Sequence, residues 1–161
     1  QSMTLTIRYA APGDEATILR LIKDLATYER EPDAVQATEQ SIRNELFGEG
    51  PQVYAFLAEL EGRPVGFALW FLTFSTWTGR PSLYLEDLFV DDAVRGQGVA
   101  RALFRRLAQE AKARNCARID WAVLDWNVEA MAFYERLGGR RQTGWQPWRL
   151  HGEALDAMAA D

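Results

Sequence analysis

The residues with the clearest chemical potential lie where two glycines separate a predicted strand from a predicted helix. Arg95-Gly96-Gln97-Gly98 follows the strand 82–90 and leads into the amphipathic segment 99–114. Glycine allows unusual backbone dihedrals and lets a ligand approach the chain closely. The first turn of a helix leaves up to four N–H groups without internal partners, and its dipole favours an anion. The stretch therefore predicts a phosphate or pyrophosphate site, although the same glycines also suit a plain strand–helix connection.

Two arginines frame this stretch and would strengthen such a site. Arg95 opens it and Arg101 lies in the first turn of the helix, so both can add charge-assisted hydrogen bonds to a phosphate. The spacing is Gly-x-Gly-x-Ala, which lacks the third glycine of the dinucleotide-binding fingerprint. No Gly-Lys-Ser or Gly-Lys-Thr follows, so the stretch is not a P-loop either.

Two consecutive carboxylates, Glu86 and Asp87, form a second group of candidates in the middle of a predicted strand. Carboxylates are depleted in strands, and neighbouring strand positions face opposite sides, so one of the two must point inward or toward the sheet edge. Such a carboxylate can accept a proton, whereas a salt-bridged structural pair is the alternative. Trp77 and Trp126 can line a channel or contact a cation through their rings, or simply pack.

The elements that must position these residues follow from the spacing of apolar side chains. Apolar residues recur every three or four positions in the predicted helices and alternate in the predicted strands. Thr38 is the expected cap of the second helix. The expected order is strand 5–9, a helix ending near 28, helix 38–47, strands 53–60, 64–73 and 82–90, helix 99–114, strand 117–124, helix 128–137, strand 145–150 and a short helix 153–159.

This order predicts the fold class. Hairpin-connected strands come first, and a strand–helix–strand unit, which needs parallel strands and a right-handed crossover, comes after them. We therefore expect an α/β protein with a mixed sheet and helices on both faces. No repeat or linker interrupts the chain, so residues 3–161 are expected to form one domain, with Gln1-Ser2 ahead of it as a cloning remnant.

Composition narrows the function classes. The chain of 161 residues has a net charge of -5, which argues against a nucleic-acid partner. No apolar run approaches the roughly 20 residues of a membrane helix, and the start lacks the features of a secretory signal. The lone cysteine, Cys116, suits a reducing cytoplasm, and the single histidine, His151, excludes a multi-histidine metal site. We expect a cytoplasmic protein with no metal, nucleic-acid or membrane partner.

The residues from Arg95 to Ala100 also match Arg-x-x-Gly-x-Ala, the pyrophosphate-binding signature of the GNAT acetyltransferases. The similarity extends over residues 5–155. The segments that resemble the spermidine/spermine acetyltransferases and their thialysine acetyltransferase relatives are 18–29, 84–90, Trp126-Asn127, 130–134 and Trp148-Arg149-Leu150. The resemblance implies the GNAT acyl-CoA N-acyltransferase fold. Its central mixed seven-stranded sheet splays open between the fourth and fifth strands, 82–90 and 117–124, to admit the pantetheine arm.

The same resemblance assigns roles to individual residues. The pantetheine arm would contact the strand before the glycine loop, the pyrophosphate would bind the loop and the first helical turn, and the thioester end would lie near residues 127–134. The implied cofactor-binding residues are Leu88, Phe89, Val90, Arg95, Gly96, Gln97, Gly98, Val99, Ala100, Arg101, Asn127, Ala130 and Tyr134. Tyr134 also matches the family's general acid, although a tyrosine beside Phe133 on a helix face is otherwise a packing residue.

Contacts with the substrate amine are also implied by the resemblance. Proton handling falls to Glu86, with Asp87 beside it, and Tyr28 and Glu29 match positions that contact the amine in the polyamine enzymes. By position alone, Tyr28 and Glu29 could equally be a solvated helix end. Related enzymes are homodimers, and residues 74–77 with the last strand offer surface for a homodimer to bury.

We therefore expect an acetyl-CoA-dependent N-acetyltransferase. It would act on the primary amine of a small cationic substrate such as a di- or polyamine, by direct attack, with Tyr134 as general acid. Two alternatives stay open: thialysine or another lysine-like side-chain amine as the substrate, and a CoA-binding regulatory module without turnover. Asp120-Trp121-Ala122 and the stretch 140–145 differ from the polyamine enzymes, so the sequence leaves the exact amine open.

Overall fold

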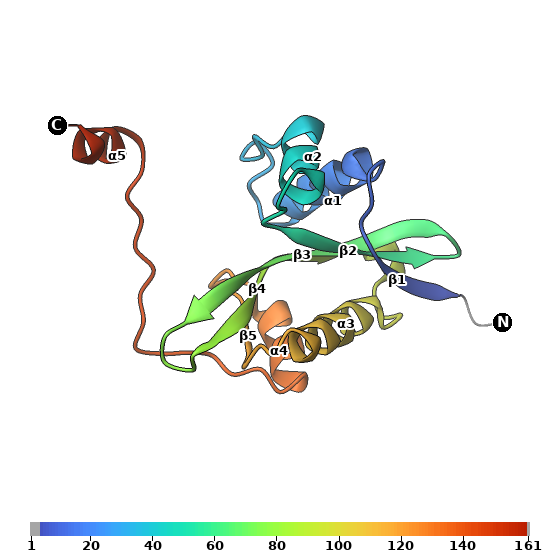
Figure 1. Ribbon diagram of the computed structural model, residues 1–161. Coiled ribbons are helices and arrows are strands. Elements are labelled where there is room, and N and C mark those ends of the chain that lie inside the picture. Colours follow the sequence, from blue (N-terminus) through green and yellow to red (C-terminus); the bar gives the residue numbers. More distant parts are fainter. Residues whose placement is uncertain (1–3, 161) are drawn as a thin grey trace. The chain divides into compact units, whose positions relative to one another are not determined.

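The computed structural model of the protein describes residues 4–160 (Figure 1). The chain divides into two compact units, residues 1–125 and 126–161, and each is considered by itself. Among the described residues, the first unit holds the sheet, three α-helices and a short 3₁₀ helix, and the second holds two α-helices. One domain over residues 3–161 stays a prediction, and Gln1-Ser2 lies outside the described residues.

Residues 4–160 contain a five-stranded sheet whose strands lie in sequence order, β1-β2-β3-β4-β5. The first four strands are antiparallel neighbours and β5 runs parallel to β4, so the sheet is mixed, as expected. The strands are β1 (Leu5–Tyr9), β2 (Tyr54–Leu60), β3 (Arg63–Ser75), β4 (Arg80–Val90) and β5 (Ile119–Asp120). Glu61 and Gly62 both have positive φ between β2 and β3, which is the geometry of a tight two-residue hairpin turn.

The expectation of seven strands is wrong for the described residues, which contain five. The strand expected at 117–124 is reduced to Ile119–Asp120, because only Leu83 and Tyr84 of β4 pair with it. The segment 145–150, also expected as a strand, pairs with no strand among residues 4–160. A strand needs a hydrogen-bonded neighbour, and Pro147 in the middle of this segment has no N–H to donate.

The helices match the predicted ones within a few residues. They are α1 (Glu15–Tyr28), α2 (Glu39–Phe47), α3 (Val99–Ala113), α4 (Val128–Arg136) and α5 (Gly152–Ala159). The prediction that Thr38 caps α2 is confirmed. Its hydroxyl accepts from the Ser41 N–H at 3.1 Å, and the Ser41 hydroxyl accepts from the Thr38 N–H at 2.9 Å. The last two helices belong to the second unit.

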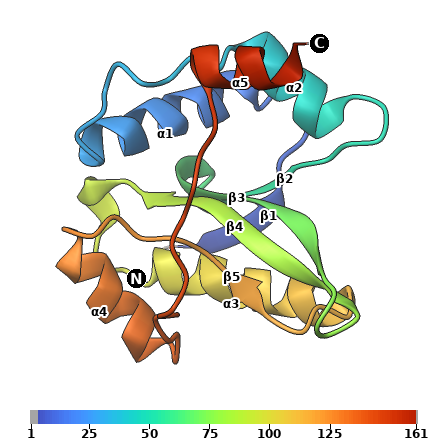
Figure 2. The same cartoon turned by 90° about the vertical axis from the view of Figure 1, so that its left-hand side faces the viewer.

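The sheet of the first unit carries a helical layer on each face (Figures 1 and 2). One core lies between the sheet and α3, and its members include Phe56, Leu83, Val99, Leu103 and Leu107. The other lies between the sheet and the pair α1 and α2, and its members include Ile18, Leu21, Ile42, Leu57 and Phe67. Each fully buried Leu, Ile or Phe contributes about 1.5–3 kcal/mol. These two layers fix α1 and α3 on opposite sides of the sheet.

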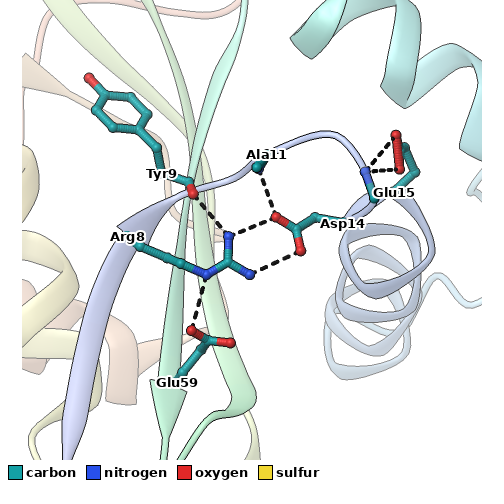
Figure 3. Close-up of polar contacts among 7 residues, drawn as sticks. Arg8, Tyr9, Ala11, Asp14, Glu15 and Glu59 are labelled. Carbon is teal, nitrogen blue, oxygen red and sulfur yellow. Dashed lines mark hydrogen bonds and ion pairs between the residues drawn. The ribbon is translucent and has the colours of Figure 1, made fainter.

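An ionic network at the edge of the sheet fixes the start of α1 (Figure 3). Arg8 of β1 donates to both Asp14 carboxylate oxygens, at 2.8 and 3.0 Å, and to Glu59 of β2 at 3.0 Å. Asp14 also accepts from the Ala11 N–H at 2.7 Å. The hydrogen bonds from Arg8 hold the pKa of Asp14 below its ordinary value. Asp14 stands at the cap position of α1, but its carboxylate joins the helix start to β1 instead of capping the helix.

Candidate active site

The loop between β4 and α3 contains two glycines in the left-handed region. φ is 82° at Gly96 and 79° at Gly98, a conformation that favours glycine. Gly98 stands at the cap position of α3, where no side chain caps the helix, and the first turn of α3 contains no acidic residue. A Cβ built at either glycine meets no atom within 4 Å. The loop therefore leaves open space beside the N–H groups that begin α3, where the helix dipole favours an anion.

The two arginines predicted to serve this loop are both exposed. Arg95 follows a short 3₁₀ helix, η1 (Asp92–Val94), and its guanidinium donates to the Asp92 carboxylate at 2.5 Å. Arg101 lies in the first turn of α3. The structure thus brings both predicted cations to the loop, but one of them is paired with a carboxylate.

The edge of β4 that faces β5 is paired only at its beginning. The parallel ladder joins Leu83 to Ile119 and Tyr84 to Asp120. From residue 85 to residue 90, β4 pairs with β3 on its other side, and no described strand pairs along this edge. The three residues predicted to contact pantetheine, 88–90, lie in this segment. An unpaired strand edge offers backbone N–H and C=O groups to a ligand.

The two consecutive carboxylates, Glu86 and Asp87, lie at a β-bulge in β4. Leu69 of β3 lies opposite Asp87 and Trp70 lies opposite Leu85, so Glu86 is an extra residue in β4. Glu86 is exposed and Asp87 is half-buried. The partial burial of Asp87 fits the expectation that one of the two carboxylates points inward or toward the sheet edge, although the bulge interrupts the strict alternation of β4.

Three carboxylates meet near the bulge: Glu86, Asp87 and Glu29. Burial, and then the charges of Glu86 and Glu29, raise the pKa of Asp87 to about 6. Burial and the charge of Glu86 also raise the pKa of Glu29. No lysine or arginine of the described chain is among the groups that shift either pKa. The ionised forms of Asp87 and Glu29 are therefore disfavoured in this acidic cluster, and a bound cation would stabilise them.

Glu29 occupies an unfavourable position for a carboxylate. It directly follows α1, whose last turn holds no basic residue, so its charge opposes the helix dipole. Tyr28, the last residue of α1, packs against the core on this side of the sheet. A carboxylate in an electrostatically unfavourable position, close to a second carboxylate, is typical of functional sites.

Trp77 is not part of the acidic cluster. It lies in the turn that joins β3 to β4 and is 86% exposed. The extended residues from Arg80 to Glu86 span about 20 Å at the usual rise of a strand. The structure therefore separates this predicted substrate residue from Glu86.

Trp126, Asn127, Ala130 and Tyr134 lie in the second unit and are described within it alone. The Asn127 side chain caps α4 by accepting the Ala130 N–H at 3.2 Å. The Tyr134 ring lies in the last turn of α4, with its centroid 5.4 Å from that of Phe133. Asn127 and Ala130 thus have a structural role of their own, beside the cofactor role expected of them.

Tyr84 is a further candidate site residue, which the sequence alone did not indicate. It lies on β4 opposite Asp120 of β5. Burial, followed by the charges of Glu86 and Asp120, raises the pKa of Tyr84. Asp120 also forms an ion pair with Arg118 at 2.9 Å. The available signal was the strand–helix–strand unit, which places β5 parallel to β4 and so brings Asp120 opposite Tyr84.

In the described part of the chain, no group of three or more His, Cys, Asp or Glu side chains could hold a metal ion. None of its helices combines the length and apolar character needed to cross a membrane.

Comparisons with known proteins agree with these features. The sequence model of the acetyltransferase (GNAT) family matches residues 17–139. The thialysine N-epsilon-acetyltransferase of Sus scrofa is 39% identical over 167 residues, covering 97% of this chain and 98% of the relative. The spermidine/spermine N(1)-acetyltransferase-like protein 1 of Homo sapiens is 35% identical over 95% of this chain, which spans 23% of that longer protein. A solved integron cassette protein from the mobile metagenome of V. cholerae has a TM-score of 0.83 and 27% identity, covering 99% of this chain and 100% of that one.

Proposed function

The chain belongs to the GNAT family of acetyltransferases and is itself an acetyltransferase, and from this premise we propose that it acetylates the primary amine of a small di- or polyamine, with acetyl-CoA as the donor. The acidic cluster of Glu29, Glu86 and Asp87 is the observation that carries the choice of a cationic substrate. An alkylammonium group supplies the positive charge that this cluster lacks. A second ammonium group on the same molecule would bind Glu29 while the first amine reacts.

Acetyl-CoA fits the residues around the glycine loop. The open space beside Gly96 and Gly98 supports binding of its pyrophosphate at the start of α3. Arg95 and Arg101 would add positive charge, and the backbone N–H groups of residues 97–100 would complete the cradle. When bound, acetyl-CoA supplies an acetyl thioester whose carbon–sulfur bond breaks as the amine nitrogen takes the acetyl group.

The unpaired edge of β4 supports the placement of the pantetheine arm. In this proposal the backbone of Leu88, Phe89 and Val90 binds the arm, because the ladder to β5 ends at Tyr84 and leaves that edge available. A strand N–H on the same edge would stabilise the negative charge that develops on the thioester oxygen. Asn127 and Ala130 are proposed to lie along the thioester end, as the family resemblance implies.

The chain's own carboxylates and tyrosine would move the two protons of the reaction. An alkylammonium pKa near 10.4 lies about three units above neutral pH, so deprotonating the amine costs roughly 4–5 kcal/mol. Glu86, directly or through a water, is the proposed acceptor of that proton, with Asp87 next to it. The Tyr134 Oη would then donate a proton to the leaving sulfur and be reprotonated by the second proton that the nitrogen loses as it becomes an amide. That transfer costs about 2 kcal/mol, from a tyrosine pKa of about 10 and a thiol pKa of about 8.5.

A second candidate substrate is thialysine or another lysine-like side-chain amine. The identity of 39% to the thialysine acetyltransferase of Sus scrofa favours it. An amino acid carries a carboxylate as well as its amines, so this substrate would need a cation near the acidic cluster. The acetyltransferase assignment also argues against a regulatory module without turnover.

A turnover screen tests the substrate class. CoA release would be measured with acetyl-CoA and a panel of diamines, polyamines, thialysine and aminoglycosides. The proposal expects the highest kcat/KM for a di- or polyamine. Glu29→Gln should raise the KM for that amine about fivefold, because a partly exposed ion pair is worth about 1 kcal/mol.

Glu31→Gln is the matched control, since Glu31 is an exposed carboxylate two residues further along the same connection. It should leave the KM unchanged. A higher kcat/KM for thialysine, together with no effect of Glu29→Gln on any diamine, would overturn the choice of a polyamine.

A further inference from the structure

An ion pair between Asp92 and Arg95 lies immediately before the glycine loop. The Arg95 guanidinium is 2.5 Å from the Asp92 carboxylate, and the two side chains are 50% and 80% exposed. The Arg95 N–H also donates to the Asp92 carbonyl at 3.1 Å. Val94, between the two residues, is buried and anchors the turn. The pair is therefore built into the short helix that leads into the loop.

The Asp92 carboxylate accepts a hydrogen bond from Nη2 of Arg95, one of the guanidinium nitrogens that a phosphate would use. Arginine binds phosphates well because its planar fork can donate two parallel hydrogen bonds, and a carboxylate competes for the same fork. Asp91 and Asp92 stand next to each other before the loop, and the charge of Asp92 is among the causes that raise the pKa of Asp91. Anions placed there repel a pyrophosphate. An ion pair as exposed as this one is weak, so a phosphate can displace it.

The geometry points to Asp92 as a competing ligand of Arg95. The ion pair between Asp92 and Arg95 is present while no phosphate lies in the loop. It breaks when the pyrophosphate of CoA binds to Arg95, and it forms again as CoA leaves. Asp92 thereby weakens the binding of CoA and speeds release of this product. The inference rests on the pyrophosphate site of the proposed function.

Asp92→Asn tests the competition, because it keeps the shape of the side chain and removes its charge. We expect the Kd of CoA, measured by calorimetry, to fall about two- to fivefold, the range expected from an exposed ion pair. Most of the change should be a slower dissociation of CoA in stopped-flow measurements. Product inhibition by CoA should strengthen by the same factor.

Two further variants separate competition from a general charge effect. Asp91→Asn removes the same charge one residue earlier, where the carboxylate lies 3.9 Å from Arg20. It should change the affinity for CoA less than Asp92→Asn does. In an Arg95→Gln background, Asp92→Asn should lose its effect, because the group for which it competes is gone.

Several results would contradict the competition between Asp92 and a phosphate for Arg95. Equal gains from Asp91→Asn and Asp92→Asn, or a gain that persists in Arg95→Gln, would reveal only a general charge effect and overturn the inference. Weaker CoA binding in Asp92→Asn would also overturn it, by showing that Asp92 positions Arg95 for the phosphate. If Asp92→Asn has no effect while Gly98→Val loses CoA binding, the competition is wrong and the pyrophosphate site stands. If Gly98→Val binds CoA as well as the original chain does, the proposed site itself is wrong.

Discussion

Replacing Asp87 with asparagine should stabilise the folded protein at neutral pH. The pKa of this carboxyl rises from 3.8 to about 6 on folding, a change of about two units, and each unit is worth about 1.4 kcal/mol. Because the pKa is raised in the folded state, the ionised form is the one that folding disfavours. Ionised Asp87 therefore costs the folded protein up to about 3 kcal/mol, and asparagine, which stays neutral, removes this cost.

Because folding raises the pKa of Asp87, the destabilisation depends on pH. Well below pH 3.8, Asp87 is protonated in both states and the penalty is absent. The penalty grows as the pH rises from about 4 to about 6, and it is constant above that range. The difference in the free energy of unfolding between Asp87→Asn and the original chain should therefore rise from about 0.5 kcal/mol at pH 4 to about 2–3 kcal/mol at pH 7.

Urea denaturation at pH values from 4 to 8 measures this difference directly. Asp33→Asn serves as the control for the loss of an exposed carboxylate, because Asp33 lies exposed in the connection between α1 and α2. A difference for Asp87→Asn that does not depend on pH, or that shrinks as the pH rises, would refute the reasoning that burial and neighbouring carboxylates penalise the charge.

Three further predictions concern the cofactor, the acid and assembly. Gly98→Val should weaken acetyl-CoA binding at least about tenfold, because positive φ strains a β-branched residue; Gly79→Val, at a positive φ in the β3–β4 turn, should bind normally. Tyr134→Phe should lower kcat by roughly 10²–10⁴ with much less change in the KM for acetyl-CoA. A near-normal kcat in a well-folded variant, with chemistry rate-limiting, would leave water or the substrate as the proton source. We also expect a homodimer by light scattering at micromolar concentration; a monomer would contradict this.

The glycine loop and the helices could be predicted because their determinants are local. Thr38, the apolar repeat of α3 and the glycines between β4 and α3 each act within a few residues of their own position. The sequence therefore indicates the position of the glycine loop without any knowledge of strand pairing. The structure confirms the start of α3 at Val99.

The bulge and the shortened β5 could not be predicted, because they depend on pairing between distant segments. Whether Glu86 is an extra residue is decided by how β4 lies against β3, and nothing near Glu86 in the sequence records that register. The length of β5 is likewise set by where its pairing with β4 ends, after Tyr84 and Asp120. The proximity of Glu29 to Glu86 is also a long-range property, and only the family resemblance had suggested that both contact the amine.

The bulge at Glu86 adds a carboxylate to β4 without changing which way the other side chains of the strand face. If Glu86 is left out of the count, the strand alternates without a break: Leu85, Leu88 and Val90 pack on the α3 side, and Phe89 packs on the α1 side. Glu86 is therefore equivalent to a one-residue insertion that the sheet absorbs without turning any other side chain over. A chain without this residue would keep its pairing and its core and lose one carboxylate. At this position, insertion and deletion, and not substitution alone, are routes by which a cation site can be gained or lost.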